Sequence, residues 1–423
     1  MTTFKDFARR ALDFYRRHRL VINFVVLGFV YFLCCFAEGA SYAALVFLLF
    51  FTFTEKNYGG VYYLIFSLPF VNVLVFATYG YVLPIVAVLF VLYAFVKIFI
   101  IERCKLNKVS LVFFILLEIY LALPLNPYST MGFVKMAVFL LGFMFLEICR
   151  EKCRLINFKT FVYAFIFGML VSTLYSLLTP YSALLQSISV DYFYNDMRRF
   201  TGLLGHPNMF SIFSLIAVIC SAYLIFNEKY RIFHSILFIL VTIAGFLTFS
   251  KTFFLLFLLV AFFMVIKMFM LNPKKALIVC AGVLVVIGFS YLLFTDFVTS
   301  FFTRFFSATQ FDEIKEFNWS EFLTFRNDLW GEYLTKIFED TYNVFFGFGL
   351  GAGKLEGLLN PHNAYITTVY QTGIIGFFLI FFLLIYMLIQ IYKSASTKKK
   401  VDWFMFVPLL VMLMVMFVED FLF

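Results

Sequence analysis

The sequence predicts an all-α, polytopic integral membrane protein with about 13 transmembrane helices and a long extracytoplasmic loop that carries amphipathic helices. Of 423 residues, 64% are hydrophobic and only 13% are charged, which is far more apolar than a soluble domain needs. Apolar runs of about 20 residues, long enough to cross a bilayer core, recur along nearly the whole chain. The runs are continuous rather than alternating, which argues against a transmembrane β-barrel. Because only helices and closed barrels satisfy every backbone hydrogen bond in lipid, the spans are expected to be helices.

The expected spans follow these apolar runs, and the second and fifth are short. They lie at roughly residues 20–37, 41–54, 60–78, 81–101, 109–123, 131–148, 158–178, 208–226, 232–249, 252–271, 276–294, 364–392 and 402–421.

The distribution of Lys and Arg sets the expected orientation. If the N-terminus is cytoplasmic, nearly all short basic loops fall on the cytoplasmic side, as the positive-inside rule demands. The basic segment 1–19 has no signal-peptide cleavage site after it, so the first span is expected to stay as an anchor. Spans 1–11 then occupy 20–294, with an outer loop at about 179–207. A long outer loop covers 295–363, and the last two spans lie in 364–423.

The charge, the cysteines and the absence of metal motifs exclude several classes of partner and cofactor. Orientation explains the net charge of +9, and no aromatic-basic motif lies outside the spans, so no nucleic-acid partner is expected. The seven cysteines fall in spans or on the inner side, which predicts no disulfide framework. No His/Cys cluster has zinc spacing and no D-x-D motif occurs, so we expect neither a metal nor a cofactor.

Three outer segments share one pattern: "RRFTGLLGHPNMF" at 198–210, "FSKTFF" at 249–254 and "NPHNAY" at 360–365. Each places polar residues where a span begins. Asn208, Ser250 and Asn363 are predicted N-caps. A helix N-terminus suits a phosphate, and Arg199 and Lys251 stand beside two of these starts. If the three starts converge, they form an anion site. Each motif alone is also an ordinary topology signal.

The stretch "GFGLGAGK" at 347–354 invites comparison with a nucleotide-binding loop. Phe348 stands where a Walker loop needs its first glycine, and Leu355 replaces the Ser or Thr. We therefore expect these glycines to permit tight backbone packing or close approach to a ligand. They precede His362, one of two outer histidines, and imidazole takes a proton near neutral pH. His362 is flanked by Pro361 and Asn363 and is a better candidate for a general base than His206.

Residues 319–340 have the spacing of an amphipathic helix. Its expected apolar face comprises Phe322, Leu323, Leu329, Trp330, Tyr333, Ile337 and Phe338. Arg326 lies on the same face, where an unpaired charge is costly. It either holds an anionic group or pairs with an acid such as Glu332.

Several charged residues fall inside predicted spans. Glu118 and Lys135 lie at similar outer depth, and we expect them to pair or to line a cavity. Lys97, Glu147 and Lys267 lie near inner span ends and are expected to snorkel to the membrane surface.

The ordered set of motifs resembles the O-antigen ligase and O-antigen or capsule polysaccharide polymerase superfamily. The matching pieces are "RFTGLLGHPN", "FSKT" where the family usually has Ser-Arg, "RNDLW" at 326–330, "GFGLGAG" and "PHNAYITTVYQTGIIG". They cover about 199–376, less than half of the chain. Lys251 departs from the family's arginine and loses its bidentate fork.

The resemblance implies a fold similar to GT-C-type glycosyltransferases and a metal-independent, inverting glycosyl transfer at the outer face of the bacterial cytoplasmic membrane. The donor would be a sugar chain on undecaprenyl pyrophosphate. Arg199 and Arg326 would neutralise the leaving pyrophosphate, and His362 would activate the acceptor hydroxyl. The other motif residues are expected to bind substrate: Arg198, His206, Asn208, Ser250, Lys251, Trp330, Asn363 and Tyr365.

Two activities of this family stay open. A polymerase would join lipid-linked repeat units, and a ligase would move the finished glycan to lipid A core, a protein or another acceptor. We favour the polymerase, with a flippase and a chain-length regulator as expected partners besides membrane lipids. A transporter is less favoured, because transporters place charges at the midplane and here they gather in outer loops.

Overall fold

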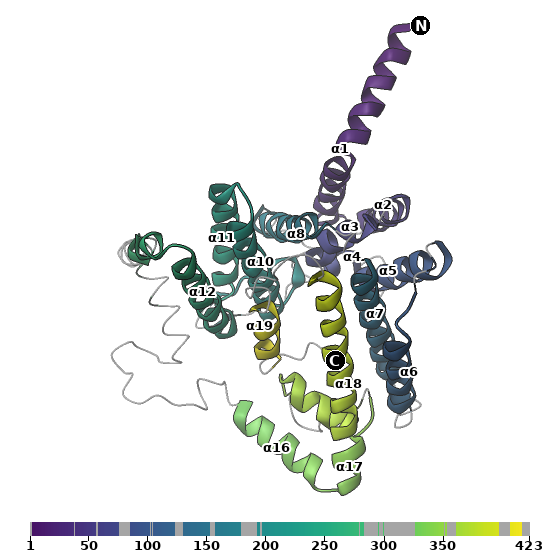
Figure 1. The fold of residues 1–423 in the computed structure, drawn as a ribbon, viewed down its shortest axis with the longest axis vertical. Helices are drawn as coiled ribbons and strands as arrows, with labels where there is room; N and C mark the ends of the chain where they lie inside the picture. Colours follow the sequence, from purple (N-terminus) through teal and green to yellow (C-terminus); the bar gives the residue numbers. More distant parts are fainter. Residues whose placement is uncertain are drawn as a thin grey trace. The chain divides into compact units, whose positions relative to one another are not determined.

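The protein is described here from a computed structural model (Figure 1). Element labels follow Figure 1. The structure describes residues 2–37, 39–55, 58–75, 85–101, 103, 105–122, 130–152, 157–178, 193–194, 197–278, 280–282, 295, 299, 326–350, 352, 361–396 and 407–416.

Almost every described segment is helical. The α-helices are α1 (Thr2–Cys34), α2 (Ala40–Thr54), α3 (Gly60–Ser67), α4 (Val71–Val75), α5 (Ile85–Ala94), α6 (Lys108–Ala122), α7 (Thr130–Lys152), α8 (Phe158–Leu178), α10 (Pro207–Asn227), α11 (Arg231–Phe246), α12 (Lys251–Leu271), α16 (Arg326–Phe338), α17 (Thr341–Phe346), α18 (Ala364–Ser396) and α19 (Val407–Val415). Short 3₁₀ turns, η1 (Leu68–Phe70) and η4 (Gly202–Leu204), and a π-helical segment, η3 (Phe95–Ile101), join them. Two-residue strands, β1 (Phe193–Tyr194) and β2 (Met197–Arg198), pair antiparallel.

The helices are apolar enough for a membrane-embedded protein. Within the described ranges, five are long and apolar enough to cross a bilayer: they lie at Arg17–Cys34, Phe158–Leu178, Pro207–Asn227, Lys251–Leu271 and Ala364–Lys393. Shorter apolar helices occupy Ala40–Thr54, Gly60–Leu74 and Arg231–Phe246. Helices thus stand in the described parts of the predicted spans, while most of 276–294 and half of 402–421 lie outside the described residues. The total of thirteen spans stays a prediction.

The chain divides into two compact units. The first comprises Met1–Arg103, Arg154–Tyr192 and Thr201–Phe213, and the second comprises Cys104–Cys153, Phe193–Phe200 and Ser214–Phe423. Each is described by itself.

In the first unit, α3 packs against α8 and α2, and α1 packs against α2. A polar cluster joins helix ends that the charge map predicts to be on one side. Arg19 forms an ion pair with Glu55 at 3.2 Å, and the hydroxyl of Tyr63 donates to Glu55 at 2.9 Å. Lys97 is buried and its Nζ lies 3.4 Å from the Glu55 carbonyl oxygen. Asn157 donates its backbone N–H to the hydroxyl of Tyr62 at 2.7 Å. The relative sidedness of these helix ends therefore agrees with the sequence.

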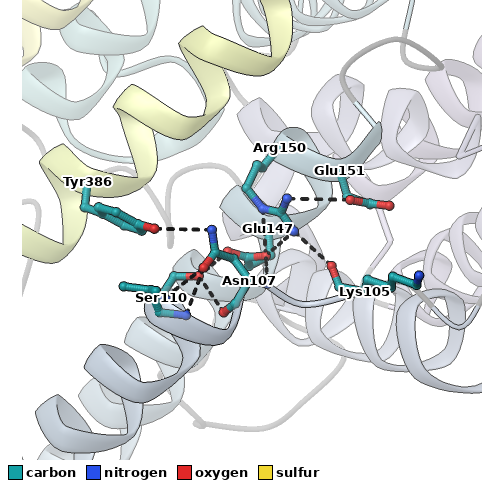
Figure 2. Close-up of polar contacts among 8 residues, drawn as sticks. Lys105, Asn107, Ser110, Glu147, Arg150, Glu151 and Tyr386 are labelled. Atoms are coloured by element: carbon teal, nitrogen blue, oxygen red, sulfur yellow. Dashed lines mark hydrogen bonds and ion pairs between the residues drawn. The ribbon is translucent and has the colours of Figure 1, made fainter.

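In the second unit, α18 packs against both α6 and α7. A polar cluster lies where α6 begins and α7 ends (Figure 2). Glu147 is 2% exposed and accepts from Ser110 Oγ at 2.6 Å and from the Asn107 backbone N–H at 3.2 Å. Arg150 also contacts Glu147, with its Nη2 atom 2.9 Å from Glu147 Oε2. Asn107 also donates its side-chain amide to the Tyr386 hydroxyl of α18 at 3.3 Å.

Three expectations of snorkelling side chains are wrong. Glu147 stays buried because Arg150, one helical turn away, pairs with it. Lys97 stays buried beside the Glu55 carbonyl, and Lys267 is buried with its Nζ 4.7 Å from the centre of the Phe226 ring. The charged group of each residue therefore interacts with a protein group instead of the membrane surface: a counter-charge for Glu147, a carbonyl for Lys97 and an aromatic ring face for Lys267.

Replacing Glu147 with glutamine tests this cluster. Glu147→Gln removes the charge that neutralises Arg150 and is expected to lower the free energy of unfolding by about 3 kcal/mol. Chemical unfolding of the detergent-solubilised chain measures the change. Glu339→Gln is the matched control, because the Lys336–Glu339 pair is exposed and should contribute less than about 1 kcal/mol. Equal, small effects of the two variants would contradict the assigned role of Glu147.

Candidate functional site

Helix α18 is broken at Gly373. This residue has φ 62° and ψ −178°, a conformation that interrupts the helix and that essentially only glycine adopts. A short arm, 364–372, precedes the break and a long half, 374–396, follows it. The long half covers about 34 Å at 1.5 Å per residue, which by itself spans a hydrocarbon core of about 30 Å. The arm is therefore free to serve another purpose, and it begins directly after His362.

The glycine stretch caps the arm. The backbone N–H of Phe348 donates to the Tyr370 carbonyl at 2.8 Å, and that of Gly349 donates to the Gln371 carbonyl at 3.0 Å. These bonds satisfy carbonyls near the end of the arm, where the break interrupts the helical hydrogen-bond pattern. Gly347 has φ 70°, and a Cβ there would lie 2.5 Å from the Gly373 nitrogen. The expected tight backbone packing is thus confirmed for 347–349, while Gly351 and Gly353 lie outside the described residues.

His362 lies between two fixed neighbours. Its φ of 48° is left-handed, which is uncommon and costly for a residue with a side chain. On one side, the indole Nε1 of Trp330 donates to the Pro361 carbonyl at 2.7 Å. On the other side, Asn363 Oδ1 accepts from the N–H groups of Tyr365 at 3.0 Å and Ile366 at 3.1 Å, which confirms Asn363 as an N-cap. The conformation of His362 is therefore imposed by contacts on both sides.

Helix α16 brings Arg326 toward this loop. Arg326 is its first residue and is half-buried, and Trp330 stands one turn further along. The apolar face is confirmed in part, since Tyr333 and Ile337 are buried against Tyr370 of the arm. Phe338, predicted on that face, is 64% exposed, because α16 ends there. Residues 319–325, with Phe322 and Leu323, lie outside the described part of the chain.

Arg199 is bonded to the loop that leads into Lys251, at a second locus of the same unit. The Nε of Arg199 donates to the Thr248 carbonyl at 3.0 Å, and the Phe200 N–H donates to the Leu247 carbonyl at 3.1 Å. Ser250 caps α12 as predicted, with Oγ accepting from the Phe253 N–H at 3.3 Å. Lys251 begins the helix. The Arg199 strand end and the α12 start thus form one cationic corner.

Helix α19 contacts both α12 and the His362 arm. It packs against α12. At its C-terminal end, the Met416 carbonyl accepts from the Ala364 N–H at 2.7 Å, and the Leu413 carbonyl accepts from the Tyr365 hydroxyl at 2.7 Å. Tyr365, predicted to bind substrate, also stacks on Phe381, with ring centres 5.6 Å apart. These contacts explain Tyr365 as an anchor of the arm.

The rest of the first outer motif, from Thr201 on, belongs to the first unit. Leu204 of η4 accepts from the Asn72 amide at 2.5 Å, and Gly202 leaves room for the Phe210 ring. The N-cap prediction for Asn208 is wrong, because α10 begins at Pro207, whose fixed φ and missing N–H suit the first helical position. His206 precedes that proline. Arg198 lies in β2, and its side chain is outside the described set.

All three motifs share a backbone feature that sequence reasoning missed. Gly205, Phe249 and His362 have φ of 68°, 49° and 48°, and each stands two residues before a helix begins. A residue with left-handed backbone conformation therefore lies at the same position before α10, α12 and α18. Two of the three carry side chains that rarely adopt it, so residue type gave no signal there.

The expected pairing of Glu118 with Lys135 is not what the described residues show. Lys135 Nζ instead donates to Gln371 Oε1 of the arm at 2.8 Å, and the Gln371 amide donates to the Ala352 carbonyl at 3.2 Å. Gln371 and Tyr120, which bonds the Thr372 carbonyl, were missed by sequence reasoning. The only signal was that the predicted span 364–392 exceeds the length that a bilayer needs.

Comparison with known proteins adds no relative. No family model matches the chain, and neither the curated proteins nor the solved structures include a match. Among the described residues, no three His, Cys, Asp or Glu side chains gather as a metal-ligand group.

Substitution at Gly373 tests the break. Gly373→Ala adds a Cβ in a left-handed backbone and places it against the Phe345 carbonyl, so the free energy of unfolding should fall by about 1–3 kcal/mol. Unfolding in detergent micelles measures it. Gly142→Ala is the control, because no atom lies within 4 Å of its added Cβ and helix propensity favours alanine by about 1 kcal/mol. A Gly373→Ala protein as stable as wild type would argue against the broken helix.

Proposed function

We propose that the protein is a polysaccharide polymerase that transfers a growing glycan from undecaprenyl pyrophosphate to a lipid-linked repeat unit at the outer face of the bacterial cytoplasmic membrane. The observation that carries the proposal is the arrangement around His362. A non-glycine residue is kept in a left-handed conformation between the Trp330–Pro361 bond and the Asn363 cap. Such backbone strain is concentrated at functional sites.

The chemistry needs a base and cationic groups, and the second unit supplies both. His362 takes the proton of the acceptor hydroxyl as its oxygen attacks the anomeric carbon of the donor sugar. The bond from that carbon to the pyrophosphate oxygen breaks with inversion, and undecaprenyl pyrophosphate leaves. Arg199, Lys251 and Arg326 neutralise the charge that develops on the leaving group.

The local geometry supports these roles without a nucleotide. The glycine stretch is used to cap the arm, so it serves the His362 loop rather than a phosphate of ATP. Arg199 bonds the Thr248 carbonyl just before α12, Lys251 is the first residue of α12, and α19 contacts both α12 and the start of the arm. The energy for transfer is already present in the glycosyl pyrophosphate bond of the donor.

The His362→Asn variant in the native host tests the proposal. Asparagine tolerates a left-handed φ but cannot act as a base, so transfer should fall roughly 100-fold or more. Surface polysaccharide resolved on a gel should lose its long chains, while single repeat units remain. His18→Asn is the control, because His18 is exposed on α1 and far from the motifs in sequence.

The same gel separates the competing functions. Full-length chains that accumulate on the lipid carrier would identify a ligase instead of a polymerase. Repeat units that fail to reach the outer face would identify a transporter. Unchanged polysaccharide from a normally expressed His362→Asn protein would remove His362 from the mechanism and with it the proposed function.

A further inference from the structure

Tyr120 of α6 meets the break in α18. Its hydroxyl lies 2.7 Å from the Thr372 carbonyl oxygen and 3.1 Å from the Phe345 carbonyl oxygen, and it donates to them. Thr372 is the last residue of the arm, and Phe345 belongs to α17. One hydroxyl from α6 therefore binds both the end of the His362 arm and the helix whose following loop caps that arm.

The surroundings of Tyr120 are shaped for this contact. The Tyr120 ring is stacked with that of Phe346, their centres 6.5 Å apart. A Cβ on Gly376, three residues after the break, would lie 2.9 Å from Tyr120 Cε1, so glycine is needed there for the ring to approach. Gly373, Gly376 and Tyr120 thus pack together as one contact site, which we call the Tyr120 junction.

Contacts at both ends fix the arm. Its covalent link to the long half of α18 is the single left-handed residue Gly373. The Ala364–Met416 and Tyr365–Leu413 bonds hold its start. The 347–349 cap, the Lys135–Gln371 bond and the Tyr120 hydroxyl hold its end. Of these contacts, the Tyr120 hydroxyl is the one that bonds Thr372, the residue next to the break, and that also reaches the Phe345 carbonyl of α17.

We infer that Tyr120 is a positioning residue, which holds the His362 arm of α18 in register for the transfer reaction. This inference rests on the proposed function. Removing the hydroxyl leaves the ring, its contact with Phe346 and the long half of α18 in place. The arm then loses its contact at the break itself, and His362 loses its alignment with the acceptor hydroxyl, a geometry on which transfer rates depend steeply.

Two matched substitutions test it on the full-length chain in detergent, with undecaprenyl-pyrophosphate-linked repeat units extracted from host membranes as substrate. Tyr120→Phe should lower kcat by 10-fold or more and leave KM within about twofold. Tyr386→Phe removes the other hydroxyl contact between the α6 region and α18, on the far side of the break. It should leave kcat unchanged while costing similar thermal stability.

A double variant separates positioning from general weakening. In the His362→Asn background, Tyr120→Phe should reduce the residual rate less than twofold, because the group that it aligns is already gone. Equal kcat for Tyr120→Phe and wild type, or equal losses in Tyr120→Phe and Tyr386→Phe, would overturn the inference while the proposed function stands. A wild-type protein that forms no polymer from this substrate would overturn the proposed function first, and the inference with it.

Discussion

The structure of the second unit depends on how the broken backbone of α18 is satisfied. A break inside an apolar helix leaves carbonyls without their usual partners, and lipid offers none. Here the N–H groups of Phe348 and Gly349 and the hydroxyl of Tyr120 supply the missing donors. Because these donors come from the 347–349 loop and from α6, satisfying the break also fixes α16, α17 and α6 around the arm. The candidate base, His362, lies just before the first residue of that arm.

Charged groups among the described residues are likewise held by specific polar partners. Each described cation with a short contact is held by a local partner: Arg150 by Glu147, Lys135 by Gln371 and Arg199 by the Thr248 carbonyl. In an apolar environment a charge without such a partner is costly. The Glu147 cluster at one end of α6, α7 and α18 and the Tyr120 junction near the other fasten the bundle at both ends.

Much of the local structure could be predicted from short-range rules. Ser250 and Asn363 cap helices as expected, and the buried part of the α16 face contains Tyr333 and Ile337. The misses arose where a neighbour decided the outcome. Helix α10 begins at Pro207, so Asn208 lies inside the helix and not at its N-cap. The Lys135 ammonium donates to Gln371 instead of pairing with Glu118. Lys135 and Gln371 are separated by 236 residues, so spacing alone carries no information about that pair.

The sequence by itself determined that the chain is helical and apolar, where the helices begin and which polar residues stand at their starts. Periodicity, caps and hydropathy act within one or two turns and can be read locally. Only the tertiary structure decided that α18 breaks at Gly373, that the glycine stretch caps this break, and that His362 adopts a left-handed backbone between Trp330 and Asn363. Those features require backbone groups from distant segments to meet, and long-range packing sets which groups meet.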